Sequence, residues 1–511
     1  GMAHFTTGND TVVAPYWEPE IPSTETDDLI KYLRGYDNPN GNTSFRPRQA
    51  DDWSTADYGG SSGEEVWKLG AVISSTPRVL RPGKVSVWSD KSGDYRTYYT
   101  SSQVKDRPSM AFVGGNDGML HAFYAGEVQA DGSDPNVSAE LKSKASGKAP
   151  GKEAWAFIPE NALPYLRWYG GLDVSCHIPT VDYRSRIIDV AVGGSWKTIL
   201  VGTMGFGGRA ITCNDVTGDG NPDTLSSSIF VLNITDPENP KLMWEKALPD
   251  NTLALTYPAV VHKGGDGTSA PMENGTWYLI AGSGPENVAG AGPTDPTSSG
   301  FTSDPSLFVY NLQTGALERR MKLTDGASFV DSSKALSSNP GVAIGEILQL
   351  DPDRDDIVDS LLFGTYSDPG GGNGTLYRLQ MPDEAASSWE IREAAVVPAD
   401  TASSNIAGRP FFASPGASFD PLKNLWVYAG TGRYMNAADT GNNEDPQFLF
   451  GYVEDCWGDG VNDNNAEGQS GSNCTTPGPI AVQDDLVPTK GITVTGKGSN
   501  LQCRCGSIKY S

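Results

Sequence analysis

An ordered set of strand-like segments recurs five times along this chain, and no other feature restricts the fold as much. Each unit opens with a β-rich run that contains a proline: "STPRVL", "HIPTVDY", "TYPAVV", "NPGVAIGEI" and "GRPFFAS". A second segment ends in glycine and a small residue, as in "MAFVGG" or "TILVGT", and a third follows, as in "GMLHAFY" or "SIFVLNI". A weaker fourth segment, such as "EAWAFIP" or "LMWEK", usually completes the unit. Each unit therefore predicts a sheet of about four strands.

The spacing of the units predicts a β-propeller. Their prolines stand at positions 77, 179, 258, 340 and 410, so the units recur every 70 to 102 residues. A four-stranded sheet cannot bury both of its faces alone, but sheets stacked around an axis can. This period exceeds the ~40–50 residues of compact blades, which puts the excess into loops, where binding residues tend to lie. Two or three ordinary β-sandwiches are the alternative, but they do not require an ordered repeat.

The composition agrees with an ordered, turn-rich, all-β protein. The 511 residues include 60 Gly and 35 Pro without a strict period, and 12 Trp, 20 Tyr and 16 Phe argue against disorder. The formal net charge of −25 repels nucleic-acid phosphate and anionic lipid, so we expect no nucleic-acid partner. No run approaches the ~18 apolar residues of a membrane-spanning helix, so we expect no transmembrane segment.

The repeats divide the chain into three parts. Residues 1–65 are interpreted as a linker with one short helix, "STETDDLIKYLRG", which Gly35 ends. The start "GMAHFTTGND" is not a signal peptide, so we expect a further N-terminal domain to precede it. Residues 66–455 form the predicted propeller, and residues 456–511 are interpreted as a Cys-rich surface appendage.

An acidic loop in the fourth unit has the spacing of a calcium site. The run "DPDRDDIVD" places Asp351, Asp353, Asp355 and Asp359 at positions 1, 3, 5 and 9, with the carbonyl of Ile357 at position 7. Calcium takes six to eight oxygen ligands, and a bound ion would cancel the repulsion between these carboxylates. The alternative is a solvated acidic turn.

The loop differs from an EF-hand in two ways. Position 6, usually glycine because the turn is sharp there, is Asp356, which tolerates left-handed geometry better than most residues. Position 12 is Leu362 rather than glutamate, and a strand-like run follows instead of a helix. We therefore expect a β-flanked site that needs a further ligand from water or a neighbouring loop.

Two other loops are weaker candidates. In "DVTGDGNPD" the side chains of Asp215, Thr217, Asp219 and Asp223 and the carbonyl of Asn221 repeat the spacing, with an Asx-rich turn as the alternative. Because threonine is a poorer ligand than aspartate, we expect a lower affinity there. A third run, "GDGVNDNNAE", fits less well and is interpreted as a solvated loop; its oxygen-bearing residues are Asp459, Asp463, Asn465 and Glu467.

The six cysteines favour disulfides in an oxidising compartment. No two of them form a CxxC pair, and their even number in a turn-rich acidic chain is typical of an exported protein. We expect Cys176 to pair with Cys213 and two bonds to form among Cys456, Cys474, Cys503 and Cys505; buried reduced thiols are the alternative.

Signals for catalysis are sparse. The four histidines are scattered without an HxH or HExxH pair. "GFGGRA" from Gly205 lacks a following helix and is interpreted as a turn. His121 alternates with apolar residues in "GMLHAFY", which indicates a hydrogen-bonded, partly buried histidine on a strand. We therefore do not expect an enzyme.

Several motifs together resemble the C-terminal propeller of the PilY family (PilC-like) of type IV pilus biogenesis factors and tip adhesins. They are "VWKLGAVISSTPRVL", "RPSMAFVGGNDGMLHAFYAG", "GKEAWAFIPENALPYL", "LVGTMGFGGRAI" and "WVYAGTGRYM", in the family's order. The lead-in "DLIKYLRG…FRPR" is similar to the stretch before the family's first blade. The resemblance covers about residues 24–455.

The resemblance implies a seven-bladed, modified propeller on the outer cell surface, at the pilus tip (fimbrium) and associated with the outer membrane. It implies type IV pilins or minor pilins, and a host or abiotic surface, as partners. It also implies that Ca²⁺ bound at Asp351–Asp359, ahead of "GNGTLYRL", opposes pilus retraction and supports twitching motility and attachment.

The chain departs from the family's pattern. Five units are visible rather than seven, Asp356 replaces the usual glycine, and the von Willebrand A-like part that often begins the family's proteins is absent. No Arg-Gly-Asp tripeptide occurs, which leaves integrin binding unsupported.

Two other functions compete with this interpretation. "GGNDGMLHAF" also resembles the blade motif of pyrroloquinoline-quinone (PQQ) dehydrogenases, but it appears well only once and no adjacent cysteines occur. A carbohydrate- or protein-binding propeller outside pili is the second alternative.

Overall fold

The structure is a computed structural model, and it describes most of the chain between residues 5 and 454 and three short strands beyond it. The described residues are 5–18, 21–36, 44–46, 48, 68–88, 93–130, 139–171, 177–264, 275–285, 303–337, 341–352, 356–367, 374–397, 410–421, 424–432, 449–454, 480–481, 493–495 and 502–504.

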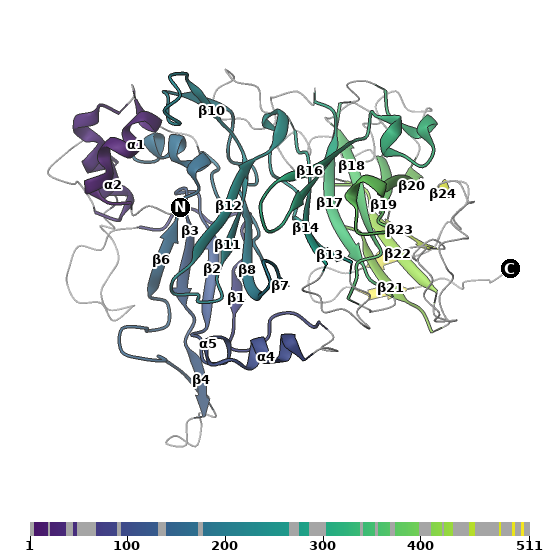
Figure 1. Ribbon diagram of the computed structural model, residues 1–511, viewed down its shortest axis with the longest axis horizontal. Helices are drawn as coiled ribbons and strands as arrows, with labels where there is room; N and C mark the ends of the chain where they lie inside the picture. Colours follow the sequence, from purple (N-terminus) through teal and green to yellow (C-terminus); the bar gives the residue numbers. More distant parts are fainter. Residues whose placement is uncertain are drawn as a thin grey trace.

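Five mainly antiparallel sheets follow one another along the described chain, and each coincides with one predicted unit (Figure 1). Blade 1 consists of β1 (Arg78–Leu80), β2 (Met110–Gly114), β3 (Leu120–Tyr124) and β6 (Glu153–Phe157). Blade 2 consists of β7 (Arg186–Ala191), β8 (Trp196–Thr203), β11 (Ser228–Asn233) and β12 (Lys241–Ala247). Blade 3 consists of β13 (Ala259–Lys263), β14 (Thr276–Gly282), β15 (Ser306–Asn311) and β16 (Leu317–Lys322). In all three, spatial order equals chain order, so each blade is a four-stranded meander.

The last two blades depart from this pattern. Blade 4 contains β17 (Val342–Leu350), β18 (Ser360–Ser367), β19 (Gly374–Gln380), β20 (Glu390–Val397) and a fifth strand, β24 (Ile480–Ala481). Blade 5 contains β21 (Gly416–Phe419), β22 (Leu425–Gly430) and β23 (Leu449–Val453). Because β24 pairs in parallel with β20, the segment predicted to be a surface appendage adds a strand to blade 4.

The blades bury their faces against one another, as the repeat requires. Along β11, Phe230 and Leu232 belong to the core shared with blade 1, whereas Ile229 and Val231 belong to the core shared with blade 3. Successive strand residues point to opposite faces, so one apolar run supplies two interfaces. Two further cores join blade 3 to blade 4 and blade 4 to blade 5. The described chain is therefore an all-β propeller-type stack with five blades, and the seven blades implied by the resemblance stay a prediction.

Short helices lie at the margin of blade 1. The predicted helix is present as a 3-10 turn, η2 (Ser23–Glu25), followed by α2 (Thr26–Leu33), and Gly35 ends it at φ +96°. The expectation of only one helix is wrong, because the residues interpreted as linker also form α1 (Asp10–Trp17). α1 and α2 pack on the turn η4 (Glu160–Tyr165) and on α6 (Leu166–Tyr169).

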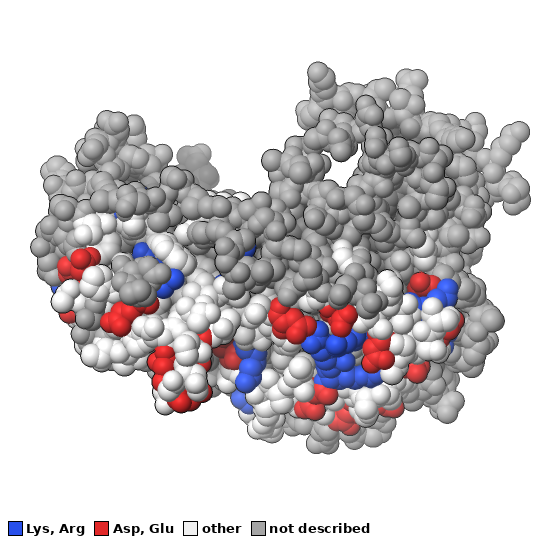
Figure 2. All heavy atoms as spheres, turned by 90° about the horizontal axis from the view of Figure 1, so that it is seen from above, with Lys and Arg blue, Asp and Glu red and all other residues white. Residues whose placement is uncertain are grey.

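Apart from short 3-10 turns, the remaining described elements are small additions to the blades. The helices are α4 (Asp94–Thr100) and α5 (Ser102–Lys105), and the strand pairs are β4 (Glu127–Ala130) with β5 (Ala139–Lys142), β9 (Ile211–Cys213) with β10 (Asp223–Leu225), and β25 (Thr493–Thr495) with β26 (Gln502–Arg504). No helix in the described ranges is long and apolar enough to span a membrane. On the face shown in Figure 2, the described basic side chains form a group that acidic side chains border. The described part of this face therefore carries both signs of charge rather than one continuous acidic patch.

Candidate functional site

The predicted calcium loop, Asp351–Asp359, is the connection between β17 and β18 of blade 4. Leu350 and Ser360 pair directly across the two strands, and the amide of Asp359 donates to the carbonyl of Leu350 at 2.9 Å. The first and last residues of the nine-residue run therefore lie beside each other. This closure brings the predicted ligands at positions 1 and 9 together.

The middle of this loop has the sharp turn that the spacing demands. Asp356 lies at φ +75°, in the left-handed region expected for position 6. Its amide donates to Oδ2 of Asp351 at 3.2 Å, so the turn folds back onto the first carboxylate. A non-glycine residue rarely adopts this conformation, and aspartate is one of the few that does so at modest cost.

The end of the loop is packed against blade 3. The side chain of Asp359 is 5% exposed, and a buried carboxylate is costly unless hydrogen bonds or a cation offset its charge. Lys263 at the end of β13 is also buried, and its ammonium donates to the carbonyl of Val358 at 3.4 Å. The loop thus spans a junction between two blades.

The structure does not assemble the whole predicted ligand set. Asp353 and Asp355 lie outside the described residues, whereas Asp351, Ile357 and Asp359 lie inside them. Within the described ranges, no three acidic, histidine or cysteine side chains gather as a metal cluster. The ligand roles of the five residues therefore stay predictions, and the observations that fit an ion are the closed loop, the turn at Asp356 and the buried carboxylate.

The second candidate loop connects β9 to β10 and folds around its own carboxylates. Asp215 accepts hydrogen bonds from the amides of Gly218 at 2.6 Å and Gly220 at 2.7 Å. Asp223 accepts from the amide of Thr217 at 2.9 Å, and this bond lowers the pKa of Asp223. These oxygens already have backbone donors, so an ion would have to share them.

The other side chains of the second loop are on the surface. Thr217, Asp219 and Asn221 are exposed, and Asp219 accepts from the amide of Asn221 at 2.8 Å. Such Asx turns are the alternative that the spacing left open. The second calcium site is therefore still a prediction.

Most of the remaining predicted site residues are not described. The third loop, Asp459–Glu467, and the cysteines Cys176, Cys456, Cys474 and Cys505 lie outside the described residues. Cys213 is buried at the end of β9, with its Sγ 3.9 Å from the carbonyl of Tyr16, and Cys503 lies on β26. No disulfide is seen among the described residues, and the predicted pairings stay predictions.

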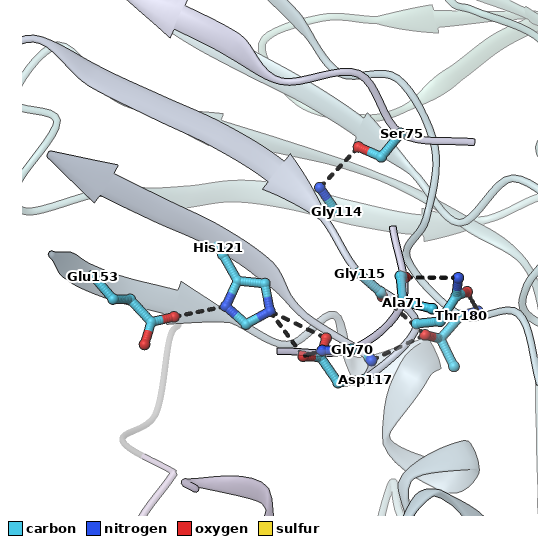
Figure 3. Close-up of polar contacts among 11 residues, drawn as sticks. Gly70, Ala71, Ser75, Gly114, Gly115, Asp117, His121, Glu153 and Thr180 are labelled. Atoms are coloured by element: carbon cyan, nitrogen blue, oxygen red, sulfur yellow. Dashed lines mark hydrogen bonds and ion pairs between the residues drawn. The ribbon is translucent and has the colours of Figure 1, made fainter. Parts of the chain in front are cut away.

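His121 belongs to a polar network that fastens blade 1, as Figure 3 shows. Its Nδ1 lies 2.6 Å from Oε1 of Glu153, and its Nε2 lies 3.0 Å from Oδ2 of Asp117. Burial lowers the pKa of His121, but the hydrogen bonds to Asp117 and Glu153 outweigh burial and raise the pKa to about 9. Asp117 in turn accepts from the amide of Gly70 at 2.7 Å. The expectation of a hydrogen-bonded histidine is confirmed, and its position between two carboxylates indicates a structural role.

Sequence reasoning missed a buried aspartate that holds the entry to blade 1. Asp182, just before β7, accepts hydrogen bonds from the amides of Ile73 and Ser75 at 2.8 and 2.7 Å, and from the side-chain amide of Asn116 at 2.8 Å. It is 6% exposed. The available signal was a single acid directly after the apolar opening run of the second unit, "HIPTVDY".

Stacked meander blades, long inter-strand loops and an acidic loop at a blade junction define a β-propeller whose candidate site lies in its loops. The family model of the PilY1 beta-propeller domain matches residues 69–474, and the chain belongs to this family.

Individual relatives agree with the family match. The chain is 26% identical over 445 residues to a type IV pilus biogenesis factor PilY1 homolog of Xylella fastidiosa, covering 84% of this chain and 24% of the relative. It is 24% identical over 462 residues to the type IV pilus biogenesis factor PilY1 of Pseudomonas aeruginosa strain PAK, covering 84% of this chain and 31% of the relative. The chain thus spans about a quarter to a third of the length of these curated relatives.

One solved structure is similar as well. The Pseudomonas aeruginosa PilY1 C-terminal domain matches with a TM-score of 0.49 and 21% identity, over 78% of this chain and 66% of that chain.

Proposed function

We propose that this chain is the β-propeller part of a type IV pilus biogenesis factor that acts at the outer cell surface, at or near the pilus tip. The observation that carries this proposal is the family match over residues 69–474. The names of the relatives, type IV pilus biogenesis factors, support it. Its partners are then type IV pilins or minor pilins and the surface to which the cell attaches, and its role is binding rather than catalysis.

The proposal includes a calcium site at Asp351–Asp359. The side-chain oxygens of Asp351, Asp353, Asp355 and Asp359 and the carbonyl of Ile357 would hold the ion, because calcium prefers several hard oxygen ligands from one flexible loop. The closed loop and the left-handed Asp356 support this assignment. A bound ion would offset the mutual repulsion of the carboxylates.

The position of the loop suggests how calcium would act on the pilus. The loop joins two strands of blade 4 and contacts Lys263 of blade 3, so an ion that orders the loop would also stiffen this junction. A stiffer propeller near the pilus tip that resists disassembly would oppose pilus retraction. Twitching motility and attachment both depend on how readily the pilus retracts. The loop Asp215–Asp223 is proposed as a weaker second site.

Complementation of a strain that lacks its own copy of the full-length protein tests this proposal. The wild-type gene is expected to restore surface pili and twitching, and Asp359→Asn is expected to lose twitching although the protein is still made. Asp106→Asn is the matched control, because this exposed aspartate lies far from the loop in sequence and, among the described residues, forms an ion pair with its neighbour Lys105.

The variants and the deletion strain test the calcium loop and the pilus function separately. Equal twitching with Asp359→Asn and Asp106→Asn would exclude the calcium loop from motility. Normal pili and twitching in the deletion strain itself would argue against the pilus function and favour a propeller that binds another partner.

A further inference from the structure

Three arginines gather around one tyrosine: two lie on the opening strands of neighbouring blades, and the third lies just before β7. The guanidinium carbons of Arg78, Arg184 and Arg186 lie 5.8, 5.0 and 4.3 Å from the ring centroid of Tyr257. Tyr257 itself lies just before β13 of blade 3. We call Arg78, Arg184, Arg186 and Tyr257 the arginine cluster.

The repeat itself brings these residues together. β1 packs beside β7, and each opening strand reaches the next blade through an arginine. Nε of Arg78 donates to the carbonyl of Ser185 at 3.1 Å, and Nε of Arg186 donates to the carbonyl of Pro258 at 2.8 Å. In Figure 1, β1, β7 and β13 follow one another from left to right. The cluster therefore lies where the opening strands of three blades meet.

The cluster carries more positive than negative charge. Arg184 forms an ion pair with Glu346 of β17, which also accepts a hydrogen bond from the hydroxyl of Tyr183 at 2.6 Å. Among the described residues, Glu346 is the one carboxylate that forms an ion pair with the arginine cluster. Three guanidiniums thus face a single carboxylate, in a chain whose net charge is −25.

The free hydrogen-bond donors belong to Arg78 and Arg186. In both side chains only Nε donates to a protein acceptor in the described structure, and the terminal nitrogens donate to none. Both residues are partly exposed, and their terminal nitrogens are not among the fully buried polar atoms without a partner. Burial, with the charges of Arg78 and Arg184, lowers the pKa of Arg186, while Tyr257 and Glu346 act in the opposite sense.

We propose that the arginine cluster binds a small oxyanion, a carboxylate or a sulfate-like group, through the terminal nitrogens of Arg78 and Arg186. A guanidinium presents a planar fork of donors that matches the oxygens of such groups, and the anion would offset the repulsion between neighbouring cations. Glu346 occupies the Arg184 side, which leaves the Arg78 and Arg186 side for the ligand.

Thermal unfolding of the whole chain in sulfate, in succinate and in chloride at equal ionic strength tests this proposal. The wild type is expected to show a saturable rise in Tm with sulfate or succinate, and the larger of the two responses identifies the tetrahedral or the carboxylate class. Arg78→Gln and Arg186→Gln are each expected to lose most of that rise. Arg96→Gln, an exposed arginine on α4, is the matched control and keeps the rise.

Two outcomes would overturn the proposal. Sulfate stabilises many proteins without binding them, so an equal rise in all four proteins would mean a general salt effect. No saturable rise in the wild type would mean that solvent alone neutralises the cluster. If Arg186→Gln does not fold, Arg186→Lys and calorimetric titration of the wild type with sulfate decide: the proposal requires saturable heat that weakens with lysine, because lysine keeps the charge but lacks the fork.

Discussion

At the scale of single residues, the blade junctions are held by buried or half-buried charges with specific partners. Asp182 accepts backbone amides from the segment before blade 1, His121 links two carboxylates, and Asp359 lies buried where blade 4 meets Lys263 of blade 3. A buried charge is tolerated only where its partners replace the lost water. Substitution of these residues therefore tests how much each junction contributes to stability.

The carboxylate of Asp359 should control calcium-dependent stability. At a calcium concentration a hundredfold above Kd, one site adds about 2.7 kcal/mol to the free energy of unfolding. We expect Asp359→Asn or Asp351→Ala to lose the rise in Tm that calcium gives the wild type, measured by scanning calorimetry against chelator. Asp219→Asn, in the second loop, should keep most of the rise. An unchanged rise in both first-loop variants would mean that another site dominates.

The left-handed turn at Asp356 should prefer glycine. A residue with a Cβ pays roughly 1 kcal/mol for this backbone conformation, and a β-branched residue pays more. In chelator, Asp356→Gly is therefore expected to unfold at a higher urea concentration than the wild type, and Asp356→Val at a lower one. Equal midpoints for the Gly and Val variants would contradict the turn at φ +75°.

His121 should make stability depend on pH. Its pKa in the folded protein is about 9, above the ordinary value of 6.5, so folding favours the protonated form. This contribution is fully present below about pH 6.5 and is lost as pH rises through about 9. The difference in Tm between wild type and His121→Asn should shrink over that window. His177→Asn, an exposed histidine, is the control, and a difference that stays constant with pH would refute the assignment.

At the scale of elements, the alternation of apolar residues along each strand explains how separate sheets become one molecule. Phe230 and Leu232 face one neighbouring blade and Ile229 and Val231 face the other, so each inner sheet is buried on both sides. Blade 5 is joined to blade 4 by an apolar core and by a buried ion pair between Arg378 of β19 and Glu454 after β23. Removal of a charged side chain from one blade is therefore expected to destabilise the neighbouring blade as well.

The Arg378–Glu454 pair gives a test of this junction. Arg378→Met leaves a 3% exposed carboxylate without its cation, and breaking a buried pair in this way costs about 3–5 kcal/mol. We expect urea unfolding to show that loss, and the double variant Arg378→Met with Glu454→Leu to recover much of it. A double variant as unstable as the single one would show that the pair is not the cause.

The sequence predicted regular elements better than contacts between distant segments. Five prolines and their β-rich runs located all five described blades, and the spacing around Asp356 predicted its left-handed turn. The contacts of Asp182 with Ile73, and the gathering of Arg78 and Arg186 around Tyr257, join residues from different units. No local pattern encodes such pairs, because stacking of the blades creates them. The parallel strand β24 was missed for the same reason, whereas α1 contains Pro15, a residue that is unfavourable in the interior of a helix.

At the scale of the whole molecule, the chain is a propeller-type stack that spans only part of longer relatives. The acidic loop of blade 4 has closed ends and a central turn that fit an ion. If calcium orders this loop as proposed, it prepares the propeller for contact with the pilus, and a binding measurement tests that step.

The measurement is capture of type IV pilins, minor pilins included, from the source organism by this chain, first with calcium and then with chelator. Wild type and Asp106→Asn are expected to retain pilins only with calcium, and Asp359→Asn to retain none in either condition. Equal capture by all three proteins in chelator, or no capture by the wild type with calcium, would show that calcium in this loop does not control binding to pilins.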